Sequence, residues 1–212
     1  MIRLPMIAPL VAGLLLAALA QEADAGAKRS RPVRTGQTTC WNTAGDVIDC
    51  VGTGHDGELR RGEPRAYLDL GDGTIRDQRT ALMWEKLSDD GSIHDKDTTY
   101  TWANAVAVKI ATLNTPPCFA GFCDWRLPNS FELYSLVNLG SVNPAVSPAF
   151  NTGCAASCTV LTCSCTVPDF YWSSSTYANS PGLAWGVLFD DGFTFADFKN
   201  NLNRVRAVRG GS

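Results

Sequence analysis

Eight cysteines carry most of the reactive chemistry that this sequence offers. An even number of cysteines in an exported chain predicts a disulfide framework. Sequence alone does not fix connectivity, and closeness along the chain is the only guide to it. It favours Cys40–Cys50 and Cys118–Cys123. The remaining four cysteines would form two bonds within one loop, for which we prefer Cys154–Cys165 and Cys158–Cys163.

A zinc site built from the last four cysteines is the competing interpretation. Structural zinc sites usually have paired ligands two to four residues apart, with a longer spacer between the pairs. The four thiols between Cys154 and Cys165 instead crowd into one short loop, with only Ser164 between the last two. Disulfides are therefore favoured over a metal.

A run of three serines, Ser173 to Ser175, is the next feature that could support catalysis. A serine nucleophile needs an adjacent base, most often histidine. The sequence has only His55 and His94, both in polar segments where surface positions are expected. We therefore predict no catalytic residue and no enzymatic activity.

Two acidic stretches could contribute ligands to calcium, which prefers six to eight oxygens. Neither has the spacing of an EF-hand, and aspartates before glycine are explained by turns. We expect no cofactor, and calcium stays open as an alternative. The stretches are Asp89, Asp90, Asp95 and Asp97, and Asp190, Asp191 and Asp197.

Aromatic and amide side chains near the C-terminus are the predicted ligand-binding residues. They combine ring area with adaptable hydrogen bonding, a mixture common at binding surfaces. They are Tyr177, Asn179, Phe193, Phe195, Asp197, Lys199, Asn200, Asn201 and Asn203. Four tryptophans inside predicted elements are expected in the core instead: Trp84, Trp102, Trp125 and Trp185.

Several cations near these elements have predicted roles of their own. Arg126 lies in an apolar segment and is expected to form an internal salt bridge or carbonyl contacts. Three arginines in the last strand could form a basic patch with Lys199, but strand alternation would split them between two faces. They are Arg204, Arg206 and Arg209.

The elements that position these residues follow a pattern of strands, two helices, a long loop and further strands. The first helix is expected from a cap at Thr99 to about Leu113, with Trp102, Val106 and Ile110 on its buried face. The second begins at the N-cap Asn129, with Glu132 completing a capping box. Its expected apolar stripe is Phe131, Tyr134 and Val137, with Gly140 at C′.

Strands are expected before and after these helices. The turn sequences Gly71–Gly73 and Asp190–Gly192 separate strand pairs. This order predicts an α+β fold with antiparallel sheets. The expected strands are 67–70, 74–76, 80–86, 170–174, 183–189, the segment from Phe193, and 204–209.

The N-terminus has the layout of a secretory signal peptide. Arg3 is followed by an apolar stretch from Met6 to Ala20 and by small residues suited to cleavage. That stretch is short for a membrane span. The expected organisation is a signal peptide over 1–25, a linker over 26–39, a Cys40–Cys50 leader segment over 40–64 and the main domain over 65–212.

Composition narrows the class of partner. The chain has 212 residues, a formal charge of −3 and 45% hydrophobic residues. The apolar fraction excludes a disordered chain, and the charge excludes a basic nucleic-acid module. We expect no nucleic acid and no membrane span after signal cleavage, and an oligomeric state that the sequence leaves open.

Six motifs in order make the main domain similar to a known family. They begin at Gly71 (GDGTIRDQRTALMWEK), Thr101 (TWANAV), Asp124 (DWRLPNSFEL), Tyr171 (YWSSSTY), Ala184 (AWGVLFDDG) and Val205 (VRAVRGG). Together they resemble the Lcl C-terminal domain family, a domain of unknown function named after the collagen-like adhesin of Legionella. The resemblance covers about residues 67–211.

The resemblance implies a C-type-lectin-like fold, related to that of the formylglycine-generating sulfatase-modifying family. In such folds two helices flank a small antiparallel sheet, the first and last strands pair, and a long loop region, here about 141–203, forms the ligand surface. The formylglycine-generating enzymes use a cysteine pair near the final strands. This chain has no cysteine after Cys165, so that chemistry is not supported.

These observations predict an exported, non-enzymatic protein that binds a glycan or a protein in the periplasm, at the cell surface or outside the cell. The family's namesake is associated with sulfated glycans, but a charge of −3 does not favour a sulfated polymer. A structural envelope protein is one alternative. A target of a diversity-generating retroelement is another, because Asn200, Asn201 and Asn203 cluster near the C-terminus.

Overall fold

The computed structural model describes residues 32–211, and the chain from Val33 onward forms one unit. The predicted signal peptide and the first part of the linker lie outside the described residues. Within residues 32–211, no helix is long and apolar enough to cross a membrane.

The first main sheet is antiparallel, with the strand order β3-β4-β5-β9. The resemblance implied that the first and last strands pair, but the last strand instead pairs with β5, where Trp84 lies opposite Val208. Arg126 continues this edge by bridging to Val208. The strands are β3 (Tyr67–Asp69), β4 (Thr74–Asp77), β5 (Met83–Glu85) and β9 (Val208–Arg209).

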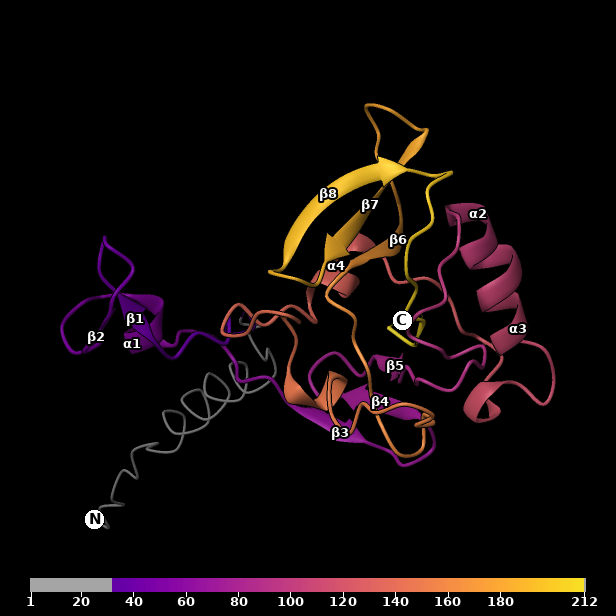
Figure 1. Cartoon of the computed structure of the whole chain (residues 1–212), viewed down its shortest axis with the longest axis horizontal. Helices are drawn as coiled ribbons and strands as arrows, with labels where there is room; N and C mark the ends of the chain where they lie inside the picture. The colour runs from indigo at the N-terminus through magenta and orange to yellow at the C-terminus, as the bar shows by residue number, and fades with distance from the viewer. Residues whose placement is uncertain (1–31, 212) are drawn as a thin grey trace, which may run out of the picture. The chain divides into compact units, whose positions relative to one another are not determined.

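The second main sheet has the order β6-β7-β8 and is also antiparallel (Figure 1). The turn Asp190–Gly192 joins β7 to β8, as expected. The outer side of β6 is covered by the C-terminal segment, since the Trp172 amide donates to the Arg204 carbonyl at 2.9 Å. The strands are β6 (Phe170–Thr176), β7 (Leu183–Leu188) and β8 (Phe193–Phe198).

The first helical segment differs from its prediction because its middle is a π-helix. It comprises α2 (Trp102–Asn104), the π-helical Ala105–Ile110 and α3 (Ala111–Leu113). The wider turn leaves Val106 exposed and buries Lys109, so the expected face is wrong at Val106, whereas Ile110 is buried as expected. Thr101, not Thr99, caps the segment by accepting from the Asn104 amide.

The second helix, α4 (Ser130–Tyr134), begins as predicted. Asn129 accepts from the amides of Phe131 and Glu132, and Glu132 accepts from the Asn129 amide, which completes the capping box. The helix is short and ends in a cap at Ser135. Gly140 is therefore not its C′ residue.

The apolar stripe expected on α4 is mostly wrong. Phe131 is 86% exposed and Tyr134 is 42% exposed. The buried positions are Leu133, Leu136 and Val137. The helix thus turns two aromatic rings toward solvent.

The leader segment is a small disulfide-closed unit. Its elements are β1 (Cys40–Trp41), β2 (Val47–Ile48) and α1 (Asp56–Leu59), and the Cys40–Cys50 bond closes the hairpin. Two short 3₁₀ turns elsewhere complete the list of elements: Phe119–Gly121 and Pro148–Phe150.

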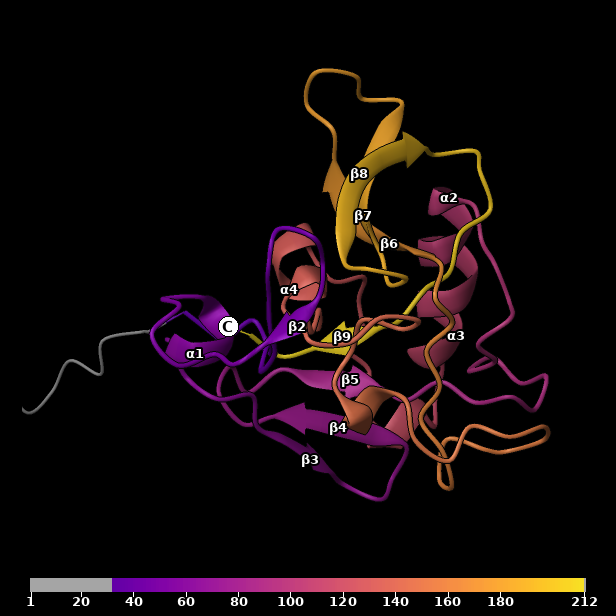
Figure 2. The same ribbon diagram turned by 60° about the vertical axis from the view of Figure 1, so that its left-hand side comes forward.

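Two clusters of buried side chains form the core. The first contains Trp84, Phe150 and Tyr171, and the second contains Trp125 and Trp172. Trp84 and Trp125 are therefore in the core, as expected. The result is the predicted α+β class: small antiparallel sheets, few helices and four disulfides (Figures 1 and 2).

Candidate functional site

A groove of about 530 Å³ lies between α4 and the β6–β7–β8 sheet. Its walls combine three aromatic rings with five hydroxyl groups. In this described part of the chain the lining includes no histidine, carboxylate, amine or thiol. The lining residues are Ser130, Phe131, Tyr134, Ser175, Thr176, Trp185, Gly186 and Thr194.

Hydrogen bonds fix the helical wall of this groove. The Ser130 amide donates to the Ser175 Oγ atom at 3.1 Å, which ties α4 to β6. Arg126 donates to both Glu132 carboxylate oxygens at 2.7 Å and to the Gly210 carbonyl at 2.8 Å. The expected internal contacts of Arg126 are therefore confirmed. The same bonds fix the first turn of α4, which contains Phe131.

The Arg126 contact also sets the ionisation of the capping glutamate. Burial by itself would raise the pKa of Glu132, but the hydrogen bonds from Arg126 and the Asn129 amide lower it. Glu132 thus stays charged and holds both partners.

Trp185 forms the sheet wall of the groove. It is partly exposed, and Tyr177 packs edge-on against it with ring centroids 5.2 Å apart. Trp102 is also only partly buried, with its Nε1 donating to the Ser173 carbonyl at 2.9 Å. The expectation of a core position is therefore wrong for Trp185, whereas Trp102 packs against the second core cluster.

A second hollow of about 250 Å³ adjoins the groove. Phe131 and Tyr134 line both. These two rings consequently form a ridge between the hollows, and Phe131 is accessible from both sides.

The other predicted aromatics belong to the opposite face of the sheet. Phe195 lies across from Gly186 and Thr194 across from Val187 in the β7–β8 register. Since successive side chains alternate between faces, Phe193, Phe195 and Asp197 point away from Trp185 and Thr194. Phe195 packs on Phe170 with ring centroids 4.3 Å apart, whereas Phe193 is 62% exposed.

Part of the predicted amide cluster forms hydrogen bonds within its own segment of the chain. Asp197 accepts from the side-chain amides of Asn201 and Asn203, both at 2.8 Å. Lys199 lies over the Trp102 ring, 4.1 Å from its centroid. Asn179 and Asn200 are exposed. The structure therefore brings Tyr177 beside the groove and distributes the other predicted residues elsewhere.

The C-terminal arginines do not assemble into a basic patch. Arg204 pairs with Asp169 at 3.0 Å and Arg209 with Asp124 at 2.7 Å. Arg206 is fully buried and is not available to such a patch. It donates to the carbonyls of Glu85 and Cys165 instead.

The first acidic stretch contains its own cation. Carboxylate oxygens of Asp89, Asp95 and Asp97 lie within 4.8 Å of one another. The Lys96 Nζ atom lies 3.2 Å from Asp89 and 2.5 Å from Asp97. An ammonium group therefore already balances part of the negative charge that a calcium ion would meet.

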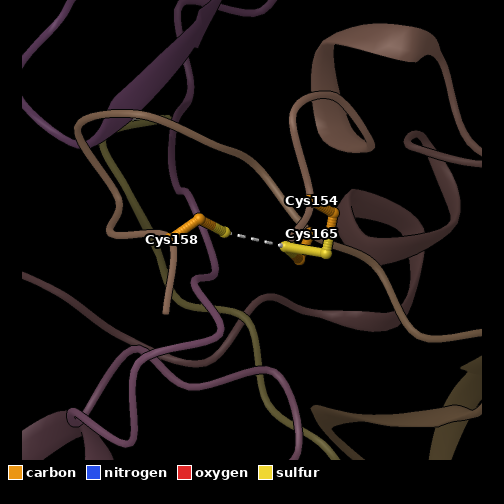
Figure 3. A group of neighbouring side chains, drawn as sticks. All are labelled: Cys154, Cys158 and Cys165. Atoms are coloured by element: carbon orange, nitrogen blue, oxygen red, sulfur yellow. Dashed lines mark hydrogen bonds between the residues drawn. A yellow bond between two sulfur atoms is a disulfide. The ribbon is translucent and has the colours of Figure 1, made fainter. Parts of the chain in front are cut away.

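All eight cysteines form disulfides, with the connectivity preferred from the sequence: Cys40–Cys50, Cys118–Cys123, Cys154–Cys165 and Cys158–Cys163. The described residues, which include every cysteine, contain no free thiol. The last two bonds adjoin, with the sulfur atoms of Cys158 and Cys165 3.8 Å apart (Figure 3). The four sulfur atoms of this loop are in the disulfides Cys154–Cys165 and Cys158–Cys163, so none of them is a thiolate that could bind zinc.

A buried charge cluster is the main feature that the sequence analysis missed. Glu85 is fully buried, and its Oε1 atom lies 2.5 Å from Lys109 Nζ and 2.7 Å from His94 Nδ1. Its Oε2 accepts from the Ala207 amide. His94 is therefore bound to a core carboxylate, and its expected surface position is wrong, whereas His55 is exposed as expected.

Opposing effects determine the ionisation of Glu85. Burial would raise its pKa, but the charge of Lys109 and the hydrogen bond from His94 lower the pKa to about 2. The carboxylate is held by three groups, those of Lys109, His94 and Ala207, and none of these residues lines the groove. We interpret it as structural.

The groove residues were missed for a specific reason. Phe131 and Tyr134 were assigned to a core stripe because their spacing fits a longer helix. The sequence also contains a second apolar set, Leu133, Leu136 and Val137. These residues occupy the core side of the segment, so Phe131 and Tyr134 lie on its other side.

Comparison with known proteins agrees with the motif order. The model of the Lcl C-terminal domain matches residues 73–209. A search of curated proteins found no match.

Proposed function

Because the chain belongs to the Lcl C-terminal domain family, we propose that it is an exported, non-enzymatic binding protein of C-type-lectin-like fold whose groove beside Phe131 takes a glycan. The observation that carries this proposal is the 86% exposure of the Phe131 ring at the rim of a groove lined by hydroxyl groups. Four disulfides indicate an extracytoplasmic protein.

The chemistry of the lining favours a sugar over other small molecules. Sugar rings have apolar C–H faces that pack on aromatic rings and hydroxyl edges that exchange hydrogen bonds. Phe131, Tyr134 and Trp185 supply rings, and Ser175 and Thr194 supply hydroxyl groups. A largely apolar concave site with a few convergent polar groups is typical of ligand sites.

The lining also favours a neutral glycan. No lysine or arginine lines the groove in this part of the chain, and recognition of sulfate needs cations. Arg126 is paired with Glu132, and the two arginines of the adjoining hollow, Arg34 and Arg65, donate to the carbonyls of Gly62 and Ser135. We therefore propose a ligand that differs in charge from the sulfated glycans associated with the family's namesake.

Binding rather than catalysis fits the same residues. The lining residues that the structure describes include no acid–base pair, and Ser175, one of the two serines there, accepts a hydrogen bond from the Ser130 amide. General acid–base chemistry requires positioned groups that exchange protons.

The experiment is a glycan-array screen of the oxidised protein, first with calcium and then with a chelator. We expect binding to a neutral glycan that Phe131→Ala abolishes. Leu161→Ala is the matched control, because Leu161 is 62% exposed and does not line the groove. The chelator arm decides whether calcium takes part.

Two outcomes would redirect the proposal. Binding lost in Phe193→Ala but kept in Phe131→Ala would move the site to the opposite face of the sheet. A blank array with folded protein would contradict a glycan ligand and favour a protein partner, to be sought by pull-down from the envelope.

A further inference from the structure

Strand β8 forms an open edge of its sheet. The order is β6-β7-β8, and no other strand of the described residues pairs with β8 on its outer side. The opposite edge, β6, is covered by the segment around Arg204. Figure 1 shows β8 at the outer edge of this sheet.

The hydrogen-bond pattern shows which backbone groups face outward. Trp185 accepts from Ser173 Oγ with its carbonyl at 2.6 Å, so odd-numbered residues of β7 direct their backbone groups toward β6. The Lys199 amide donates to the Gly182 carbonyl at 3.0 Å. Backbone groups alternate in direction along an antiparallel strand. Those of Thr194 and Ala196 therefore point outward.

Phe198 is the third outward residue, but its groups already have partners. Its amide donates to Asp197 Oδ1 at 2.8 Å, and its carbonyl accepts from the Asn201 amide at 2.9 Å. The open edge therefore consists of two amides and two carbonyls, those of Thr194 and Ala196.

This edge has few of the features that protect sheet edges. Natural proteins protect such edges with proline, inward-pointing charge, bulges or a covering loop. The sequence of β8, Phe-Thr-Phe-Ala-Asp-Phe, has no proline and no lysine. Phe193 and Phe198 are 62% and 59% exposed. An unpaired edge of this kind is a template for another strand.

We propose that β8 pairs with β8 of a second copy of this chain, in an antiparallel arrangement about a two-fold axis at Phe195. Thr194 of each copy then lies opposite Ala196 of the other. All four open backbone groups of each copy gain partners. A register centred on Ala196 is disfavoured, because it would use the Phe198 groups that already have partners.

Charge complementarity supports the same register. Its ends place Lys199 of each copy, whose Nζ atom also donates to Thr176 Oγ1 at 2.8 Å, opposite Asp191 in the turn of the other. Asp191 is exposed, and opposite charges across strands are favourable. The centre places Phe195 against its own copy, and Phe193 lies beside it on the same face.

The pairing would join two three-stranded sheets into one. Each sheet keeps its own groove, so the dimer would present two grooves to a multivalent ligand. One strand pair buries less surface than a typical stable interface. We therefore expect a weak dimer, monomeric at low micromolar concentration.

Sedimentation velocity of the oxidised protein over a wide concentration range tests the proposal. We expect a monomer–dimer equilibrium that Ala196→Pro weakens more than about tenfold. Proline there removes an outward amide and leaves the β7 ladder intact. Ala196→Ser keeps the amide and is the matched control, expected to dimerise like the wild type.

Two further measurements keep the test decisive. Lys199→Glu should weaken the dimer through repulsion by Asp191, less so at high salt. Amide exchange at Thr194 and Ala196 should slow as the protein concentration rises. A monomer at all concentrations would overturn the proposal. So would a dimer unaffected by Ala196→Pro or, if that variant does not fold, by Lys199→Glu.

Discussion

The Nζ atom of Lys109 lies 2.5 Å from the Oε1 atom of Glu85, and both side chains are buried. The π-helical turn that contains Lys109 directs it inward, and Glu85 ends strand β5. The pair therefore fastens the helix to the first sheet at the centre of the molecule.

Removing one member of this pair should destabilise the fold strongly. Lys109→Met leaves a buried carboxylate with less compensation, and Glu85→Gln leaves a buried ammonium. Breaking a buried pair in this way typically costs about 3–5 kcal/mol. Urea unfolding with the disulfides intact measures the free energy of each variant.

The double variant is the control for this prediction. Removing both charges should cost less than the sum of the two single changes, because neither charge is then left alone. Additive costs would mean that the two groups stabilise the fold independently.

Acid should weaken the fold through the same carboxylate. The pKa of Glu85 is lowered from 4.5 to about 2 in the folded protein, against burial, by Lys109 and His94. A carboxylate whose pKa is lower in the folded than in the unfolded protein stabilises the fold at pH values above the unfolded pKa. That stability is lost as the pH falls from about 4.5 toward 2. The loss should be roughly 3 kcal/mol.

Unfolding free energies of the wild type and Glu85→Gln between pH 6 and 2 test this. We expect the wild type to lose more stability than the variant in this interval. If the unfolding free energy falls with pH equally in both proteins, Glu85 is not the group responsible for the loss of stability in acid.

Local signals in the sequence predicted local structure well. The capping box of Asn129 and Glu132 acts within three residues and appears as expected. The turn at Asp190–Gly192 likewise needs only its own residues to favour a hairpin. Such elements were predictable because their hydrogen bonds close within a few residues.

The features that were missed depend on distant partners. Arg206 is buried because it meets the Glu85 carbonyl, 121 residues away in sequence. The expected face of Val106 fails because it assumed 3.6 residues per turn, whereas a π-helix changes the spacing. Phe131 is exposed because α4 ends early and Leu133 takes the core position. Of these three residues only Phe131 lines the groove.

The two adjoining disulfides should contribute unequally to stability. Cys154–Cys165 spans 11 residues and Cys158–Cys163 spans 5. Loop-closure entropy predicts about 3 kcal/mol for the first and about 2 kcal/mol for the second. Paired replacement by alanine, followed by urea unfolding, should therefore destabilise more at Cys154–Cys165.

Both cysteines of a bond must be replaced together in this experiment. Cys165 lies 3.8 Å from the sulfur of Cys158 and from that of Cys163. A single Cys154→Ala change would leave a thiol able to exchange with the second bond. Disulfide mapping of that single variant by mass spectrometry should find Cys165 bonded to Cys158 or Cys163. An intact Cys158–Cys163 bond with a free Cys165 thiol would contradict this expectation.

Gly186 lies within β7 and Gly182 lies just before it, and the two glycines should respond differently to replacement by alanine. A Cβ atom at Gly186 would lie 2.3 Å from the Tyr171 carbonyl oxygen and 2.3 Å from the Phe170 ring, whereas one at Gly182 would meet nothing within 4 Å. Backbone atoms cannot yield as a flexible side chain can, so Gly186→Ala should destabilise by about 1–3 kcal/mol or more. Gly182→Ala should be neutral or stabilise by up to about 1 kcal/mol, because it restricts the unfolded chain. Thermal unfolding of the two variants side by side measures this difference, and a tolerated Gly186→Ala would mean that β6 and β7 are less closely packed behind the groove than the structure shows.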